Sequence, residues 1–142
     1  MLRLILDTSV LGKICHPKPN LEISGWIKGV LEAGKAVIFI PEIADYELRR
    51  ELVRIKSQIS LDRLDQLENL LEYVPIETSH MRKAAELWAK ARSKGNVTAP
   101  KEALDGDVIL AAQAIAVNAT VLTENVKHLS WFVDVKSWQD LV

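Results

Sequence analysis

Acidic and amide side chains occur at four widely separated points of this 142-residue sequence. They are Asp7, Glu47, the pair Asp105 and Asp107, and the pair Glu124 and Asn125. Carboxylates that are brought together in a crevice repel one another and raise one another's pKa. A hard divalent cation removes this cost, and Mg²⁺ takes oxygen ligands while it keeps several of its waters. The acidic residues therefore indicate a metal site, provided that the fold brings them together.

A cation bound in this way can promote attack on a phosphate ester. Water bound to the ion is more acidic than bulk water, and the ion stabilises negative charge on the phosphate and on the leaving oxygen. Two ions, roughly 3.5–4 Å apart, can hold both the attacking and the leaving oxygen. This chemistry needs no histidine or serine nucleophile, and the sequence leaves open whether one ion or two are bound.

The expected secondary structure alternates short apolar strands with amphipathic helices. The expected strands cover 2–6, 36–40, 73–76, 120–123 and 132–135. The expected helices cover about 21–32, 41–55, 61–71 and 104–117, and another opens at 78 and stops at Gly95-Asn96. A loop is expected over 97–103, and a short helical segment after 123. Apolar strands separated by helices are typical of a parallel sheet that is buried on both faces. We therefore predict one three-layer α/β/α domain over 1–142, with a central, mainly parallel sheet of four to five strands.

This architecture gives the separated acidic residues a place to meet. In open parallel sheets, sites form in the crevice outside the carboxyl ends of the strands. Asp7 follows the first predicted strand directly, and Glu124 and Asn125 follow the fourth. The amino end of the helix that carries Asp107 can join them there, so these side chains are expected to share one crevice.

The composition indicates a globular protein and excludes several kinds of site. Hydrophobic residues make up 49% of the chain and charged residues 26%, which argues against disorder. Cys15 is the only cysteine, so the chain can form neither an intrachain disulfide nor a multi-cysteine zinc site. With a net charge of −1, binding of nucleic acid would need a local basic rim or a bound metal. No apolar run is long enough to span a membrane, and nothing resembles a signal peptide. A cytoplasmic location without a membrane partner is therefore expected.

Four segments of the chain resemble the sequence motifs of the PIN-domain family. They are LILDTSVL at 4–11, IADYEL at 43–48, DGDVILAAQA at 105–114 and VLTENVKHL at 121–129. They occur in the family's order and span nearly the whole chain. The resemblance is closest to the toxins of VapBC-type toxin–antitoxin pairs of bacteria and archaea. It implies a PIN-like fold, a Mg²⁺- or Mn²⁺-dependent ribonuclease site, an RNA substrate, a homodimer and a small antitoxin that blocks the site.

The resemblance also assigns roles to individual residues. Asp7, Glu47 and Asp107 match the catalytic and metal-binding acids of the family. Asp105 matches an often acidic neighbour and is expected among the metal ligands. Three hydroxyl side chains are expected to support the site by orienting a ligand, a bound water or a phosphate: Thr8, Ser9 and Thr123.

The fourth motif departs from the family pattern at one position. Asn125 fits the position two residues after the threonine, but His128 stands where the family often has an acid. The ligand that completes the site is therefore left open between Glu124 and Asn125. The three histidines of the chain lack the spacing of metal ligands and are expected to be structural or exposed.

Each acidic residue also has an ordinary structural interpretation. Asp7 can belong to a helix cap, and Glu47 lies in a charged stretch that is typical of a solvated helix face. Asp105 and Asp107 can be a cap and a favourable first-turn charge for the helix dipole. We expect Asp45 to face solvent, because residues two apart on a helix do not share a face.

Two other functions remain open on the sequence alone. A non-catalytic RNA- or protein-binding member of the same fold would fit the altered fourth motif and the near-neutral charge. A phosphotransfer or receiver-like domain would use Asp7 as the phosphate acceptor, but a second aspartate does not follow two positions later. Metal binding would separate the first alternative from a nuclease, and a stable acyl phosphate would support the second.

Overall fold

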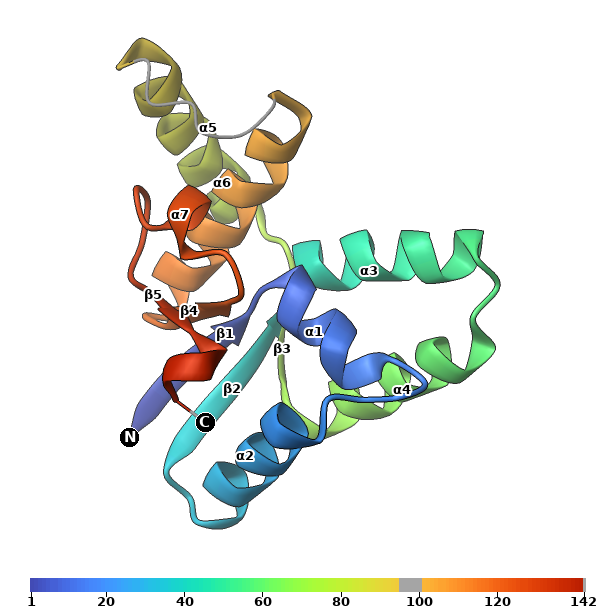
Figure 1. Ribbon diagram of the computed structural model, residues 1–142. Coiled ribbons are helices and arrows are strands. Elements are labelled where there is room, and N and C mark those ends of the chain that lie inside the picture. The colour runs from blue at the N-terminus through green and yellow to red at the C-terminus, as the bar shows by residue number, and fades with distance from the viewer. Residues whose placement is uncertain (95–100, 142) are drawn as a thin grey trace.

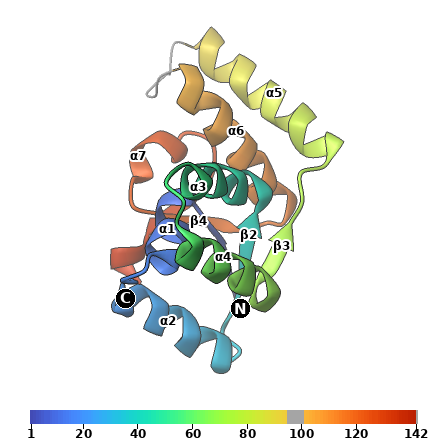
Figure 2. The same ribbon diagram turned by 90° about the vertical axis from the view of Figure 1, so that its right-hand side faces the viewer.

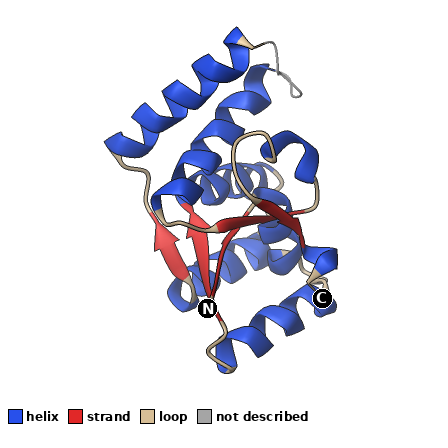
Figure 3. Cartoon of the chain, turned by 90° about the vertical axis from the view of Figure 1, so that its left-hand side faces the viewer, coloured by secondary structure: helices blue, strands red, loops and turns tan. Residues whose placement is uncertain are grey.

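The computed structural model describes residues 1–94 and 101–141, and its centre is a five-stranded parallel sheet. The strands are β1 (Leu2–Leu6), β2 (Ala36–Pro41), β3 (Glu72–Val74), β4 (Thr120–Thr123) and β5 (Val135–Ser137). Their order across the sheet is β3-β2-β1-β4-β5, so β1 lies at the centre. Figure 3 shows the strands enclosed between helices, and the expected parallel α/β fold is confirmed.

Helices cover both faces of the sheet. They are α1 (Thr8–Cys15), α2 (Leu21–Glu32), α3 (Glu42–Arg54), α4 (Gln58–Leu70), α5 (Thr78–Ser93), α6 (Lys101–Ala116) and α7 (Val126–Leu129), with a 3₁₀ turn at Trp138–Asp140. Figures 1 and 2 show α1 to α4 on one side of the strands, with α6 and α7 on the other. In the described part of the chain, we find no helix with the length and apolar character that a membrane crossing requires.

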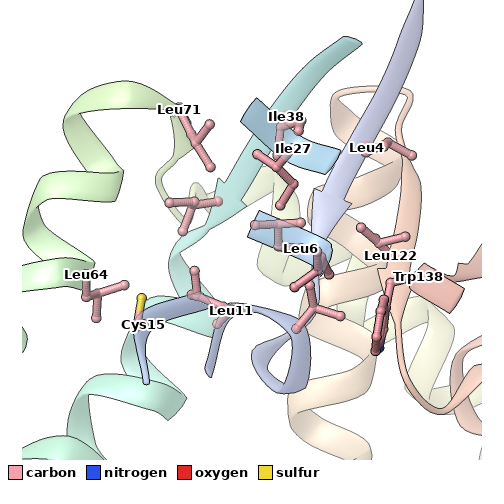
Figure 4. Close-up of a cluster of buried hydrophobic side chains, with 14 of the residues drawn as sticks. Leu4, Leu6, Leu11, Cys15, Ile27, Ile38, Leu64, Leu71, Leu122 and Trp138 are labelled. Carbon is pink, nitrogen blue, oxygen red and sulfur yellow. The ribbon is translucent and has the colours of Figure 1, made fainter. Parts of the chain in front are cut away.

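Alternation along β1 divides the core into two parts. Leu4 and Leu6 point to the face covered by α1 to α4, and Ile5 points to the face covered by α6 and α7. All three side chains are buried. Figure 4 shows Leu4 and Leu6 within the first of these clusters, which includes Leu122 of the neighbouring strand β4. The two buried faces fix the end of β1, and therefore the position of the residue that follows it.

A third cluster joins α5 to α6. Ala84 and Leu87 of α5 pack against Leu104 and Val108 of α6. In Figures 1 and 3 the two helices run side by side and extend beyond the edge of the sheet. The helix that carries Asp107 is therefore held by the sheet at one end and by α5 at the other.

Several element boundaries differ from the expected ones, among them β3, which covers Glu72–Val74 instead of 73–76. The helix α4 begins at Gln58 instead of 61, and β5 covers Val135–Ser137 instead of 132–135. The difference in β5 arises because its register is set by pairing of Val135 with Val121, whereas Phe132 lies in the turn after α7. The helix α6 begins at Lys101, so 101–103 are helical and not part of a loop. The rest of the expected loop, at 97–100, lies outside the described residues, as does the expected end of α5 at Gly95-Asn96.

Candidate active site

Asp7 lies where β1 ends and α1 begins. It occupies the N-cap position of α1, as the helix-cap interpretation expects, but its side chain makes no capping hydrogen bond. Its Oδ2 instead accepts hydrogen bonds from the Thr123 hydroxyl, at the end of β4, and from the Ser9 hydroxyl at 3.3 Å. Because β1 and β4 are neighbours, the pairing of Leu6 with Leu122 brings these side chains together. The carboxylate is thus oriented by hydroxyls and not by the helix.

Glu47 reaches this region from α3. The Thr8 hydroxyl donates a hydrogen bond of 2.8 Å to Oε1 of Glu47. The other oxygen lies against α6, since a Cβ atom added at Gly106 would come within 2.6 Å of Oε2. The side chain is half-buried, so its interpretation as a solvated helix position is wrong. Glu47 is held between the start of α1 and the residue that precedes Asp107.

Asp107 brings a third carboxylate to the same place. Its pKa is raised to about 6, chiefly by burial and also by the negative charges of Asp7 and Glu47, while His128 acts in the opposite direction. Asp7 and Glu47 are therefore close enough to affect the ionisation of Asp107. Because α6 begins at Lys101, Asp107 is the seventh residue of the helix and cannot be a first-turn charge. Asp7, Glu47 and Asp107, which are far apart in the sequence, therefore lie near one another in the fold.

The three carboxylates do not form a ready-made cage for a metal ion. Across residues 1–94 and 101–141, no group of three or more His, Cys, Asp or Glu side chains is arranged to hold one. The donor set still fits Mg²⁺, because this ion is commonly bound through one or two carboxylates and fills its remaining positions with water. Burial is the main cause of the raised pKa of Asp107, and the repulsion by Asp7 and Glu47 that adds to it is what a bound cation would offset.

The fourth motif surrounds Asp7 through hydrogen bonds. Thr123 is buried, and its hydroxyl accepts a hydrogen bond of 3.1 Å from the backbone N–H of Asn125 while it donates to Asp7. The Asn125 side chain caps α7 by accepting from the Lys127 N–H at 3.2 Å. Glu124 is exposed and forms an ion pair of 3.0 Å with Lys13 of α1. Asn125 thus helps to fix Thr123, and through it Asp7.

Asp105 lies apart from the other predicted ligands. Its exposed side chain lines a hollow of about 380 Å³ between α5 and α6, together with Met81 and Trp88. It is not among the charges that shift the pKa of Asp107. Its role as a metal ligand stays a prediction.

Two residues have surroundings that the sequence did not suggest. His128 is half-buried near Asp107, and within the described part of the chain its buried Nδ1 has no hydrogen-bond partner. Its position three residues after Asn125 was the available signal. The expectation for Asp45 was wrong: only 14% of its side chain is exposed, and it pairs with Arg49 at 2.9 Å and accepts from the Tyr73 hydroxyl at 2.8 Å.

The chain belongs to the PIN domain family, whose model matches residues 4–130. The match includes the carboxylates of the site and the four motifs that carry the resemblance. A comparison with curated protein sequences finds no match.

Solved structures of VapBC and FitAcB proteins share the fold. One is the crystal structure of VapBC2 from Rickettsia felis bound to a promoter DNA fragment. It matches with a TM-score of 0.77 and 23% identity over 96% of this chain and 99% of that one. FitAcB from Neisseria gonorrhoeae matches with a TM-score of 0.75 and 22% identity over 96% and 98%. DNA-bound VapBC from Salmonella typhimurium matches with a TM-score of 0.70 and 20% identity over 97% and 99%.

Proposed function

We propose that this protein is a Mg²⁺- or Mn²⁺-dependent endoribonuclease that hydrolyses RNA phosphodiester bonds. The observation that carries the proposal is the convergence of Asp7, Glu47 and Asp107, two of them oriented by threonine hydroxyls, with a raised pKa at the third. Other proteins of the PIN domain family are nucleases, which supports a nuclease function for these carboxylates.

Each side chain has a defined part in this proposal. Asp7 and Asp107 would bind the cation, and Glu47 would complete its surroundings directly or through water. When bound, the ion supplies an acidified water and stabilises charge on the phosphate. Thr123 and Thr8 keep the carboxylates of Asp7 and Glu47 from turning toward solvent, because each donates a hydrogen bond to one of their oxygens. Asp105 is kept as a further candidate ligand.

We also propose that the protein is the toxin of a toxin–antitoxin pair. The likeness to VapBC and FitAcB structures over nearly the whole chain supports this role. The same proposal includes a small antitoxin that covers the site and a homodimeric protein. It also includes a cytoplasmic location and a single domain over 1–142. A short neighbouring reading frame that encodes a DNA-binding protein would support it.

Cleavage of a labelled single-stranded RNA tests the activity. We expect cutting with Mg²⁺ or Mn²⁺ and none with EDTA. Asp7→Asn should abolish cutting while the circular dichroism spectrum is unchanged, because the amide keeps the shape of the side chain but removes its charge. Asp134→Asn, at an exposed position before β5, is the matched control and should cut like the wild type. Undiminished cutting by Asp7→Asn would reject the assigned site.

A non-catalytic RNA- or protein-binding role is the second candidate. Two observations favour it. His128 stands where proteins of the family often have an acidic residue, and the described side chains include no group of three or more that is arranged to hold a metal ion. Calorimetric titration separates the two candidates. Absence of Mg²⁺ and Mn²⁺ binding at millimolar concentration would establish the second.

A further inference from the structure

A hollow of about 490 Å³ opens beside the carboxylates, on the exposed face of α1 and the loop that leads to α2. We call it the α1 hollow; its lining residues are Ser9, Gly12, Lys13, His16, Lys18 and Asn20. Positions 9, 12, 13 and 16 have the spacing of one helix face. Ser9 also contacts the catalytic region, because its hydroxyl donates to Oδ2 of Asp7 at 3.3 Å. One residue of the hollow's lining is therefore in direct contact with Asp7 of the proposed active site.

The α1 hollow is positively charged, although the chain as a whole is not. Its lining carries the two ammonium groups of Lys13 and Lys18, and among the described residues no carboxylate lines it. Glu124 pairs with Lys13 at 3.0 Å but does not line the hollow. The Lys13 side chain remains 40% exposed beside this pair. This is the local basic rim that an overall charge of −1 requires of a nucleic-acid-binding protein.

The loop that presents these groups is held in place. The Asn20 N–H donates to the Lys13 carbonyl at 3.2 Å, and the Arg63 side chain donates to the His16 carbonyl. Nδ1 of His16 lies 3.0 Å from the backbone nitrogen and 3.2 Å from the carbonyl oxygen of Lys18, so the ring is held against the backbone of the loop. Two prolines in the loop, at 17 and 19, fix their own φ angles. An anion would thus meet donors that are already positioned, with little entropy left to lose.

We propose that the α1 hollow binds a backbone phosphate of the RNA strand, next to the phosphate that is cleaved. This inference rests on the proposed ribonuclease function. It adds a second place where the protein contacts its RNA substrate, and this contact would orient the strand. Contacts to phosphates fix the register of a strand without reading its bases. Lys18 and Lys13 supply the charge, while Ser9 and His16 make the lining between them polar. The hollow would set which phosphate lies at the carboxylates.

RNA binding by a cleavage-deficient protein tests this inference. Fluorescence anisotropy is measured with a labelled single-stranded RNA and Asp7→Asn protein in EDTA, over a series of salt concentrations. In this background Lys18→Gln should weaken binding about 5- to 10-fold and lower the slope of log Kd against log salt by about 0.7, the value for one lost phosphate contact. Lys28→Gln, at an exposed position of α2 outside the hollow, should change neither quantity. Glu124→Gln should tighten binding, because it releases Lys13 from its ion pair.

The outcomes separate this inference from the function on which it rests. If the wild type cuts RNA but Lys18→Gln binds with unchanged affinity and salt slope, the α1 hollow is not a phosphate site. Equal losses in Lys18→Gln and Lys28→Gln would also overturn the inference, because they would show only a general charge effect. If a polyglutamate peptide depends on Lys18 and RNA does not, the occupant is an acidic protein segment. If the wild type neither binds nor cuts RNA, the proposed function fails as well.

Discussion

The carboxylate of Glu47 lies so close to the backbone of Gly106 that a Cβ atom at position 106 would come within 2.6 Å of Oε2. This contact connects α3 to the turn of α6 that carries Asp107. A glycine inside a helix costs roughly 1 kcal/mol relative to alanine. The close approach of Glu47 gives this glycine a structural reason.

We therefore expect Gly106→Ala to displace Glu47 and to lower RNA cleavage by about 10-fold or more, since small displacements at a reacting centre are costly. The fold should persist, because alanine favours a helix. Gly29→Ala is the matched control, as a Cβ atom at 29 would meet nothing within 4 Å. It should stabilise α2 by about 0.5–1 kcal/mol and leave activity unchanged. Full activity in Gly106→Ala would show that the position of Glu47 does not matter.

Thr123→Val should remove the hydroxyl that orients Asp7 while it keeps the shape of the side chain. The backbone N–H of Asn125 also loses its acceptor. We expect a loss of about 1–2 kcal/mol in the free energy of unfolding and a fall in kcat of about 10-fold. Denaturant melts and single-turnover cleavage measure the two effects. Thr123→Ser retains a hydroxyl and should restore most of the activity, whereas equal defects in both variants would point to packing instead.

Asp107→Asn should stabilise the metal-free protein at neutral pH. The pKa of Asp107 is raised from its usual 3.8 to about 6 in the folded state, so the native protein binds more protons than the unfolded chain between these values. The contribution of Asp107 to stability is therefore present below pH 3.8 and is lost as pH rises through about 6. In EDTA at pH 8, Asp107→Asn should be more stable than the wild type by about 1–2 kcal/mol. The difference should shrink toward pH 4, and a difference that is constant with pH would refute this assignment.

His128→Asp tests the departure in the fourth motif. His128 lowers the pKa of Asp107, whereas an aspartate there would raise it. We expect the variant to be less stable than the wild type in EDTA and to bind Mg²⁺ about 10-fold more tightly, because it adds a hard oxygen ligand. Thermal melts with and without Mg²⁺ measure both effects. A variant with unchanged Mg²⁺ affinity would place position 128 outside the metal site.

Sequence patterns predicted those parts of the site that depend on local order. Asp7 directly follows one strand and Thr123 ends its neighbour, so a parallel sheet brings them to one edge. The place of Glu47 came from the family resemblance, because its own neighbours suggest a solvated helix. The contact with Gly106 and the burial of Asp45 could not be predicted, since they depend on the packing of α3 against α6, α4 and β3.

Local sequence patterns also could not predict where the short elements begin and end. The strand β5 has only three residues, and its register is set by the pairing of Val121 with Val135. The apolar residues 132 and 133 before it resemble a strand, yet they pack beside α6 and α7. The start of α6 is a similar case, because Lys101 and Glu102 are good helix formers in a polar segment that also suits a loop.

Binding of Mn²⁺, followed by electron paramagnetic resonance of the free ion, tests the central claim most directly. The wild type and Asp134→Asn should show the same saturable binding at pH 7.5. Asp7→Asn, Glu47→Gln and Asp107→Asn should each weaken it by about 10-fold or more, because each removes a charge from one shared site. Wild-type Mn²⁺ binding in all three variants would contradict the account, since the carboxylates would then not act on a common ion.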